Sequence, residues 1–222
     1  EVYFELAAVA WGRGDLEVCR ELAEEGLVLA VGESMRKPRG ELLLALTAVQ
    51  AFNGQLKEAA AGIEEAQVIL RQIGHKRLSC VALCNLSEIY VWQGHLALAN
   101  EKAKEALELA RELDYRVGRA NAVRMIGEVL MEIGRFDEAE RQLRQALAQA
   151  NRMKLDPEII AARHALARLS TILNETDNAE EHTTVAKAAA DRRDPEQYLP
   201  ALFAISAWTC AKTGDHHDKK GC

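Results

Sequence analysis

The feature that most constrains this chain is a helix-breaking residue that recurs at a fixed spacing of 40 positions. The breakers are Gly14, Gly54, Gly94, Gly134, Asn174 and Gly214. A fixed period of about 20 to 50 residues is typical of repeat architectures, in which one small unit stacks on copies of itself. The 222 residues are therefore expected to form five units and part of a sixth, rather than one or two globular domains.

The residues around each breaker repeat one physical pattern. A small residue stands seven positions before it and again five and twelve positions after it, as Gly127, Ala139 and Ala146 do in the fourth unit. A large apolar residue stands eight positions before it, as Leu86 and Leu166 do. Large apolar and small residues at helical spacing on both sides of a turn predict an antiparallel helical hairpin.

Each unit is thus predicted to hold two helices, and the units span approximately 1–38, 39–75, 76–115, 116–155, 156–195 and, in part, 196–222. The first helices are expected near 1–12, 40–52, 78–92, 117–132, 157–172 and 197–212. The second helices are expected near 15–34, 55–72, 95–113, 135–153 and 175–192. Segments such as Lys37-Pro38-Arg39-Gly40 and Gly74-His75 fit helix stops between units.

Composition supports an all-α chain and excludes several functions. Alanine occurs 37 times against 11 aromatic residues, which favours close-packed helices over a sandwich or barrel. The net charge is −6 and no basic run exceeds two residues, so direct binding of nucleic acid is not expected. Charges interrupt every apolar run, so no membrane span is expected. Five cysteines without a disulfide-type spacing indicate reduced thiols and a cytoplasmic location.

The pattern resembles the tetratricopeptide repeat (TPR). Gly127, Ala139 and Ala146 match the family's small positions, and Leu143 stands at its large apolar position. The usual period is about 34 residues, so the second helix is expected to be about one and a half turns longer here. The family also places a proline about seventeen positions after the turn glycine, and this chain has other residues there. The residues there are Val31, Arg71, Arg111, Asn151 and Asp191.

The longer units are similar to arrays in bacterial signal-transduction ATPases, in maltose-activator-like (LuxR-type) transcription regulators and in repeat-bearing nucleotide cyclases. The resemblance implies an all-α, right-handed superhelical α-solenoid of about five and a half repeats. It also implies a non-catalytic sensing or scaffold module of a larger bacterial regulatory protein. Such a module would bind a protein, a peptide or another domain of the parent chain on its concave face.

TPR arrays line the concave face mainly with first-helix positions thirteen, ten, six and three before the turn. In the first units these positions are largely apolar, as with Phe4, Trp11 and Leu44. The middle of the array carries the residues predicted to bind the partner, which are Glu88, Asn121, Arg124, Glu128, Met131, His164 and Arg168. The alternative is that Arg124 with Glu128, and Glu128 with Arg168, are solvated ion pairs worth about 0 to 1 kcal/mol each.

No enzyme motif is present: the sequence has no nucleophile elbow, phosphate loop or dinucleotide fingerprint. Cys80 and Cys84 lie four apart with His75 nearby, but zinc usually takes four ligands, so buried free thiols are predicted. We therefore expect no enzyme activity, no cofactor and no metal. Two alternative functions remain, a receptor for a small-molecule inducer and a rigid oligomerisation scaffold.

The ends of the sequence suggest a piece of a longer polypeptide, because the chain begins Glu1-Val2 without an initiator methionine. The predicted helix 197–212 is apolar on several sides and lacks a complete second helix to cover it. Homodimerisation through this C-terminal end is therefore predicted. Its contact residues would be Leu202, Phe203, Ile205 and Trp208.

Overall fold

The structure is a computed structural model, and it describes residues 2–191 as an array of α-helices. The helices are α1 (Val2–Arg13), α2 (Leu16–Leu29), α3 (Arg36–Phe52), α4 (Leu56–Gln72), α5 (Lys76–Trp92), α6 (Leu96–Glu112), α7 (Arg116–Glu132), α8 (Phe136–Met153), α9 (Asp156–Ile172) and α10 (Thr176–Asp191). A short 3₁₀ helix, η1 (Glu33–Met35), precedes α3. Sequential helices pair as antiparallel hairpins, which confirms an all-α, TPR-like solenoid of about five repeats.

The predicted breakers close the turn inside each hairpin. Gly94 has φ +77° and Asn174 has φ +60°, the left-handed conformation in which glycine and asparagine are least strained. The turns between units repeat with the same period, because Gly74, Asp114 and Lys154 also have positive φ. The sequence pattern did not reveal this second series, since only one of its members is a glycine.

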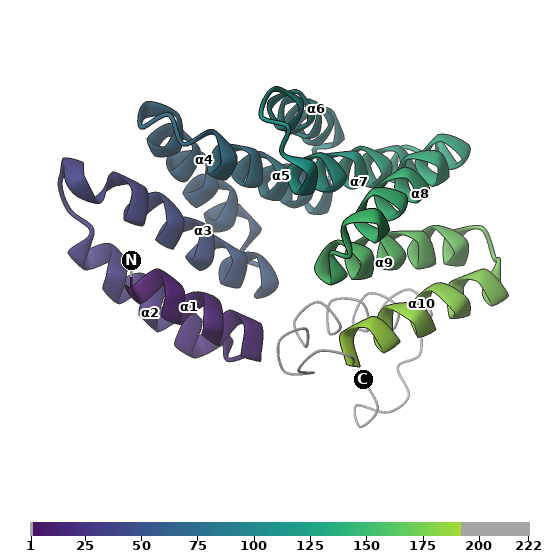
Figure 1. Cartoon of the computed structure of the whole chain (residues 1–222), viewed down its shortest axis with the longest axis horizontal. Coiled ribbons are helices and arrows are strands. Elements are labelled where there is room, and N and C mark those ends of the chain that lie inside the picture. Colours follow the sequence, from purple (N-terminus) through teal and green to yellow (C-terminus); the bar gives the residue numbers. More distant parts are fainter. Residues whose placement is uncertain (1, 192–222) are drawn as a thin grey trace.

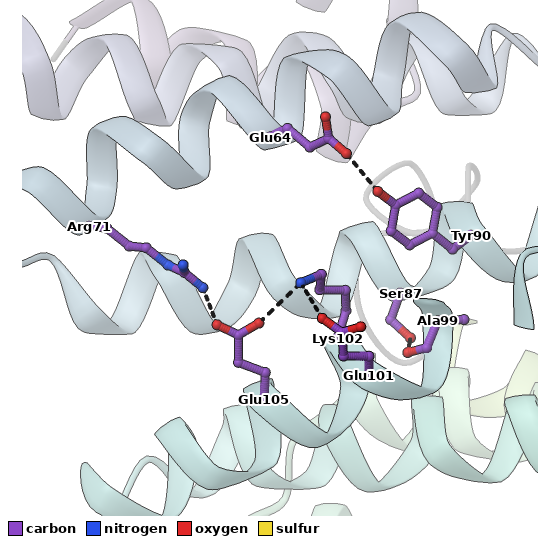
Figure 2. Close-up of polar contacts among 8 residues, drawn as sticks. All are labelled: Glu64, Arg71, Ser87, Tyr90, Ala99, Glu101, Lys102 and Glu105. Atoms are coloured by element: carbon purple, nitrogen blue, oxygen red, sulfur yellow. Dashed lines mark hydrogen bonds and ion pairs between the residues drawn. The ribbon is translucent and has the colours of Figure 1, made fainter. Parts of the chain in front are cut away.

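The hairpins stack into a curved array (Figure 1). In this view α4 and α6 lie on the outer side of the curve relative to α3 and α5. The first helices of successive units contact one another directly, in the pairs α1–α3, α3–α5, α5–α7 and α7–α9. We call the side that these first helices form the inner side. The small residues in the predicted positions let the helices approach, because Ala59, Ala99 and Ala139 are each fully buried. Ser87 Oγ donates a hydrogen bond of 2.9 Å to the Ala99 carbonyl oxygen and joins α5 to α6 (Figure 2).

The first junction between units differs from the prediction. Helix α2 ends at Leu29 rather than near residue 34. Ala30 already leaves the helical conformation with ψ +65°, and Gly32 follows with φ +92°. Helix α3 begins at Arg36, so Lys37 to Gly40 lie in its first turns instead of stopping a helix. Proline is tolerated at Pro38 because the first turn of a helix leaves its N–H groups without intrahelical partners.

Helix α1 exposes positions that later units bury. Val2 is 66 % exposed and Val9 is 52 % exposed. The residues 40 positions later, Leu42 and Val49, are 2 % and 1 % exposed. In α3 the covering comes from the preceding helix, since Leu42 contacts the α2 backbone at Gly26.

No helix among residues 2–191 is both long and apolar enough to cross a membrane. The predicted contact residues Leu202, Phe203, Ile205 and Trp208 lie outside the described residues, as does the predicted helix 197–212. Dimerisation through them stays a prediction.

Candidate functional site

Helices α5, α7 and α9 bring five charged side chains into one ion-paired row, which we call the inner strip. Its members are Glu88, Arg124, Glu128, Glu132 and Arg168. Arg124 pairs with Glu128 on its own helix and lies 3.8 Å from Glu88 Oε1 on α5. Arg168 on α9 reaches back to α7, where its Nη1 is 3.2 Å from Glu128 Oε2 and its Nη2 is 2.8 Å from Glu132 Oε1.

The 40-residue register explains why these side chains meet. Glu88, Glu128 and Arg168 each stand six positions before a breaker, in three successive units. Equivalent positions of stacked units lie side by side, so a charge in one unit faces the equivalent charge in the next. Arg124 stands one turn before Glu128 on the same face of α7, where residues four apart interact.

Burial separates this row from an ordinary surface ion-pair cluster. Glu128 is 4 % exposed and Arg168 is 8 % exposed. The two predicted ion pairs, Arg124 with Glu128 and Glu128 with Arg168, therefore exist. The alternative that they are solvated is wrong. The free energy of about 0 to 1 kcal/mol that is typical of surface ion pairs does not apply to them. A buried pair is strongly interdependent, because removing one partner leaves an uncompensated charge in a poor solvent.

The protein environment also shifts the ionisation of nearby groups. Burial raises the pKa of the Glu88 carboxyl, and the positive charge of Arg124 opposes this shift. Burial lowers the pKa of His164 on α9 to about 4, so its imidazole is neutral at pH 7. The Nε2 atom of His164 is buried and has no hydrogen-bond partner among the described residues.

The remaining predicted site residues divide between surface and core. Asn121 is partly exposed in the second turn of α7, and its side chain lies within hydrogen-bonding reach of Glu158 on α9. Burial raises the pKa of the Glu158 carboxyl, and the Asn121 hydrogen bond counteracts that rise. Met131 is 2 % exposed and packs with Leu143 and Leu166 in the core. Its side chain therefore does not line the inner surface.

Sequence reasoning missed two acidic residues of this region, Glu132 and Glu158. Glu132 lies two positions before the breaker, outside the four positions expected to line the inner face. Its spacing of four from Glu128 was an available signal, because it places both carboxylates within reach of one guanidinium. Glu158 lies near the start of α9, and its closeness to Asn121 follows only from the packing of α7 against α9.

The ion pairs on the outer side have a different character (Figure 2). Arg71 of α4 pairs with Glu105 of α6, which also receives Lys102 Nζ at 3.4 Å. The side chains of Arg71 and Glu105 are 55 % and 36 % exposed. Water competes for such pairs, so they contribute little to stability.

Two pockets of about 340 and 630 Å³ lie away from the inner strip, and none of its residues lines either one. Cys80 and Cys84 are buried, as predicted, at 0 % and 7 % exposure. Within residues 2–191, no three His, Cys, Asp or Glu side chains form a group that could hold a metal ion.

Comparison with solved structures finds the same fold in several TPR proteins. A Rap protein complexed with competence and sporulation factor aligns with a TM-score of 0.73 at 19 % identity, covering 85 % of this chain and 53 % of that chain. This chain therefore spans about half the length of that protein. A thermophilic TPR protein of Thermus thermophilus aligns with a TM-score of 0.65 at 21 % identity, covering 90 % and 96 % of the two chains.

A putative kinesin light chain of Podosopora anserina with TPR-like repeats aligns with a TM-score of 0.60 at 20 % identity, covering 86 % and 94 % of the two chains. No curated protein sequence matches this chain. The model of the MalT-like TPR region matches residues 1–208. That match covers nearly the whole chain and agrees with the stacked hairpins and their small-residue register: the chain belongs to the MalT-like TPR family.

Proposed function

We propose that the inner side of this TPR array binds an extended peptide or a protein segment, and that the array serves as a sensing or scaffold module of a larger bacterial regulatory protein. The observation that carries this proposal is the inner strip. Five charged side chains from three units lie in one row, on the concave side that curved repeat arrays use as an extended binding surface.

The fold relatives support a peptide rather than a metabolite as the partner. The Rap structure described above is complexed with competence and sporulation factor. In this chain the inner strip runs along α5, α7 and α9, and its residues do not line the pockets of about 340 and 630 Å³ described above. A small-molecule receptor usually surrounds most of its ligand in a cleft, whereas a row of side chains suits an extended segment.

Selection of binders from a displayed random peptide library tests the proposal. Inner-side variants Ala48→Trp and Asn121→Trp place a bulky ring on α3 and α7, where the native side chains are partly exposed. The matched control Lys104→Trp alters the exposed outer side of α6. We expect selected peptides to lose at least about tenfold in affinity to the inner variants, equivalent to about 1.4 kcal/mol, and nothing to the outer variant.

A library that yields no binder, or binders that respond only to the outer variant, would overturn the proposal. Circular dichroism of each variant before the binding assay shows that the helical array is intact. If the inner variants bind as tightly as the wild type, the scaffold alternative is favoured instead.

A further inference from the structure

We infer that the segment bound by the inner strip is basic, with lysine or arginine side chains opposite α5, α7 and α9. This inference rests on the proposed function and adds the charge of the partner to it. Of the residues that the sequence predicted to bind the partner, it assigns the outer contacts to carboxylates rather than to Arg124 and Arg168.

The charges of the inner strip are layered. The side chains of Arg124 and Arg168 are 13 % and 9 % exposed, whereas those of Glu88 and Glu132 are 32 % and 36 % exposed. The guanidinium groups thus lie beneath, and the outer carboxylates reach the solvent. An approaching partner meets carboxylate oxygens first, and these accept hydrogen bonds from cationic donors.

Both guanidinium groups are already ion-paired with carboxylates of the array, although Arg124 Nε has no hydrogen-bond partner among the described residues. Arg124 contacts Glu88 and Glu128, and Arg168 contacts Glu128 and Glu132. An acidic partner would have to displace one of these carboxylates and leave it buried without compensation, at a large cost in free energy. A basic partner needs no such exchange.

The region also carries more negative than positive charge. The inner strip holds three carboxylates and two guanidinium groups. Glu158 adds a further carboxyl group beside Asn121, and the neutral imidazole of His164 offsets none of this charge. Repulsion between carboxylates is stronger where they are partly buried, because the local dielectric constant is lower. A cation placed here reduces that repulsion.

Two buried polar atoms of this region have no hydrogen-bond partner among the described residues, His164 Nε2 and Arg124 Nε. Buried polar atoms are nearly always hydrogen-bonded in native proteins. A neutral imidazole nitrogen can accept a hydrogen bond, and a guanidinium Nε–H donates one. A basic segment brings both N–H donors and backbone carbonyl acceptors, so neither atom requires an acidic side chain in the partner.

The inner surface beside the strip, on α1 and α3, indicates which side chains the other end of the bound peptide carries. Trp11, Ala48 and Ala51 on α1 and α3 are partly exposed and apolar or aromatic. A segment that follows the inner side from α9 to α1 therefore passes from carboxylates to apolar side chains. The matching peptide carries basic residues at one end and apolar residues at the other.

Three matched libraries of displayed peptides test this inference. They differ only at two fixed central positions, which are Lys, Glu or Gln. We expect the Lys library to yield the tightest inner-side binders, and their Kd to rise about tenfold or more from about 50 to about 500 mM NaCl, because salt screens exposed charges. Glu88→Gln and Glu132→Gln should each weaken the Lys peptides about three- to tenfold.

The matched control is Glu138→Gln, which removes a carboxylate of similar exposure, 38 %, that pairs with Arg135 at the start of α8. It should leave the affinity unchanged. If inner-side binders come mainly from the Glu or Gln library, or ignore both strip substitutions, the basic partner is refuted while the peptide-binding function stands. If no library yields an inner-side binder, both proposals fall.

Discussion

The inner side of the array is built in two ways. In the first two units, α1 and α3 present apolar side chains, and the rings of Trp11 and Phe52 meet edge to face with centroids 6.4 Å apart. In the next three units, α5, α7 and α9 are joined by the buried ion pairs of the inner strip. The repeat geometry is the same in both halves, since the period of 40 residues is unbroken.

The difference shows that close packing through small residues is general to all units, whereas the inner ion pairs are particular to three of them. Small residues at the helix crossings let any two units pack, whatever faces inward. Apolar contacts are non-directional, whereas a guanidinium shared by two carboxylates requires a particular lateral position of its helix. The charged half should therefore be the more sensitive to single substitutions and to pH.

The largest effect is expected for Glu128→Leu, which removes the carboxylate shared by Arg124 and Arg168. Both guanidinium groups would then be buried beside fewer negative charges, and we expect a loss of about 3 kcal/mol or more in the free energy of unfolding. Urea denaturation followed by circular dichroism measures it. Replacing Arg124 and Arg168 by Met in the same chain should restore most of the loss, and a loss below about 1 kcal/mol would contradict the buried network.

The apolar half is probed by Leu44→Ala. Leu44 is 7 % exposed and packs in the core cluster of α3, α4 and α5. Shortening it should cost about 2 to 3 kcal/mol, through lost burial and the cavity left behind. The cost should be the same at low and high salt, whereas a clear salt dependence would show that charge also stabilises this half.

The pH dependence of stability separates the two halves further. The pKa of His164 is about 4 in the folded protein, below its value of about 6.5 in an unfolded chain. Between these values the unfolded state binds more protons, so stability falls as the pH falls from about 6.5 toward 4. We expect about 2.5 kcal/mol to be lost to this group by pH 4.5.

The measurement compares urea denaturation of the wild type and of His164→Gln across this range. Glu88 and Glu158 have raised pKa values, so their contribution to stability grows as the pH falls, opposite to that of His164. Both proteins contain these two carboxyl groups, so the difference between the two curves isolates the imidazole. Parallel curves for the two proteins would show that His164 titrates normally.

The smallest effect is expected for Arg71→Ala on the outer side. Its partner Glu105 keeps a contact with Lys102, and both members of the pair are accessible to water. We expect a change of less than about 1 kcal/mol, measured by thermal or urea unfolding. A loss as large as that of Glu128→Leu would mean that exposure does not distinguish the two sets of ion pairs.

Among residues 2–191 the periodicity was sufficient to predict the ten helices, apart from the bounds at the first junction, and two ion pairs of the candidate site. The pairs of Glu128 with Arg124 and Arg168 follow from a spacing of four on one helix and of 40 between units. Their burial was not predictable, because it depends on how tightly α5, α7 and α9 pack together. The early start of α3 was missed as well, because Pro38 indicates a helix stop but is equally suited to a first turn.

The position six residues before each breaker carries a charge in three successive units, which matters when a whole unit is deleted from the array. Glu88 and Glu128 occupy the same place in consecutive units, and Arg168 follows in the third. Deleting the 40 residues 116–155 would therefore set Glu88 against Arg168, as Glu128 stands against it now. The shortened chain would keep an ion pair, Glu88 with Arg168, between the two units joined by the deletion. A recombination event that removes one unit would therefore leave charged side chains paired between neighbouring units.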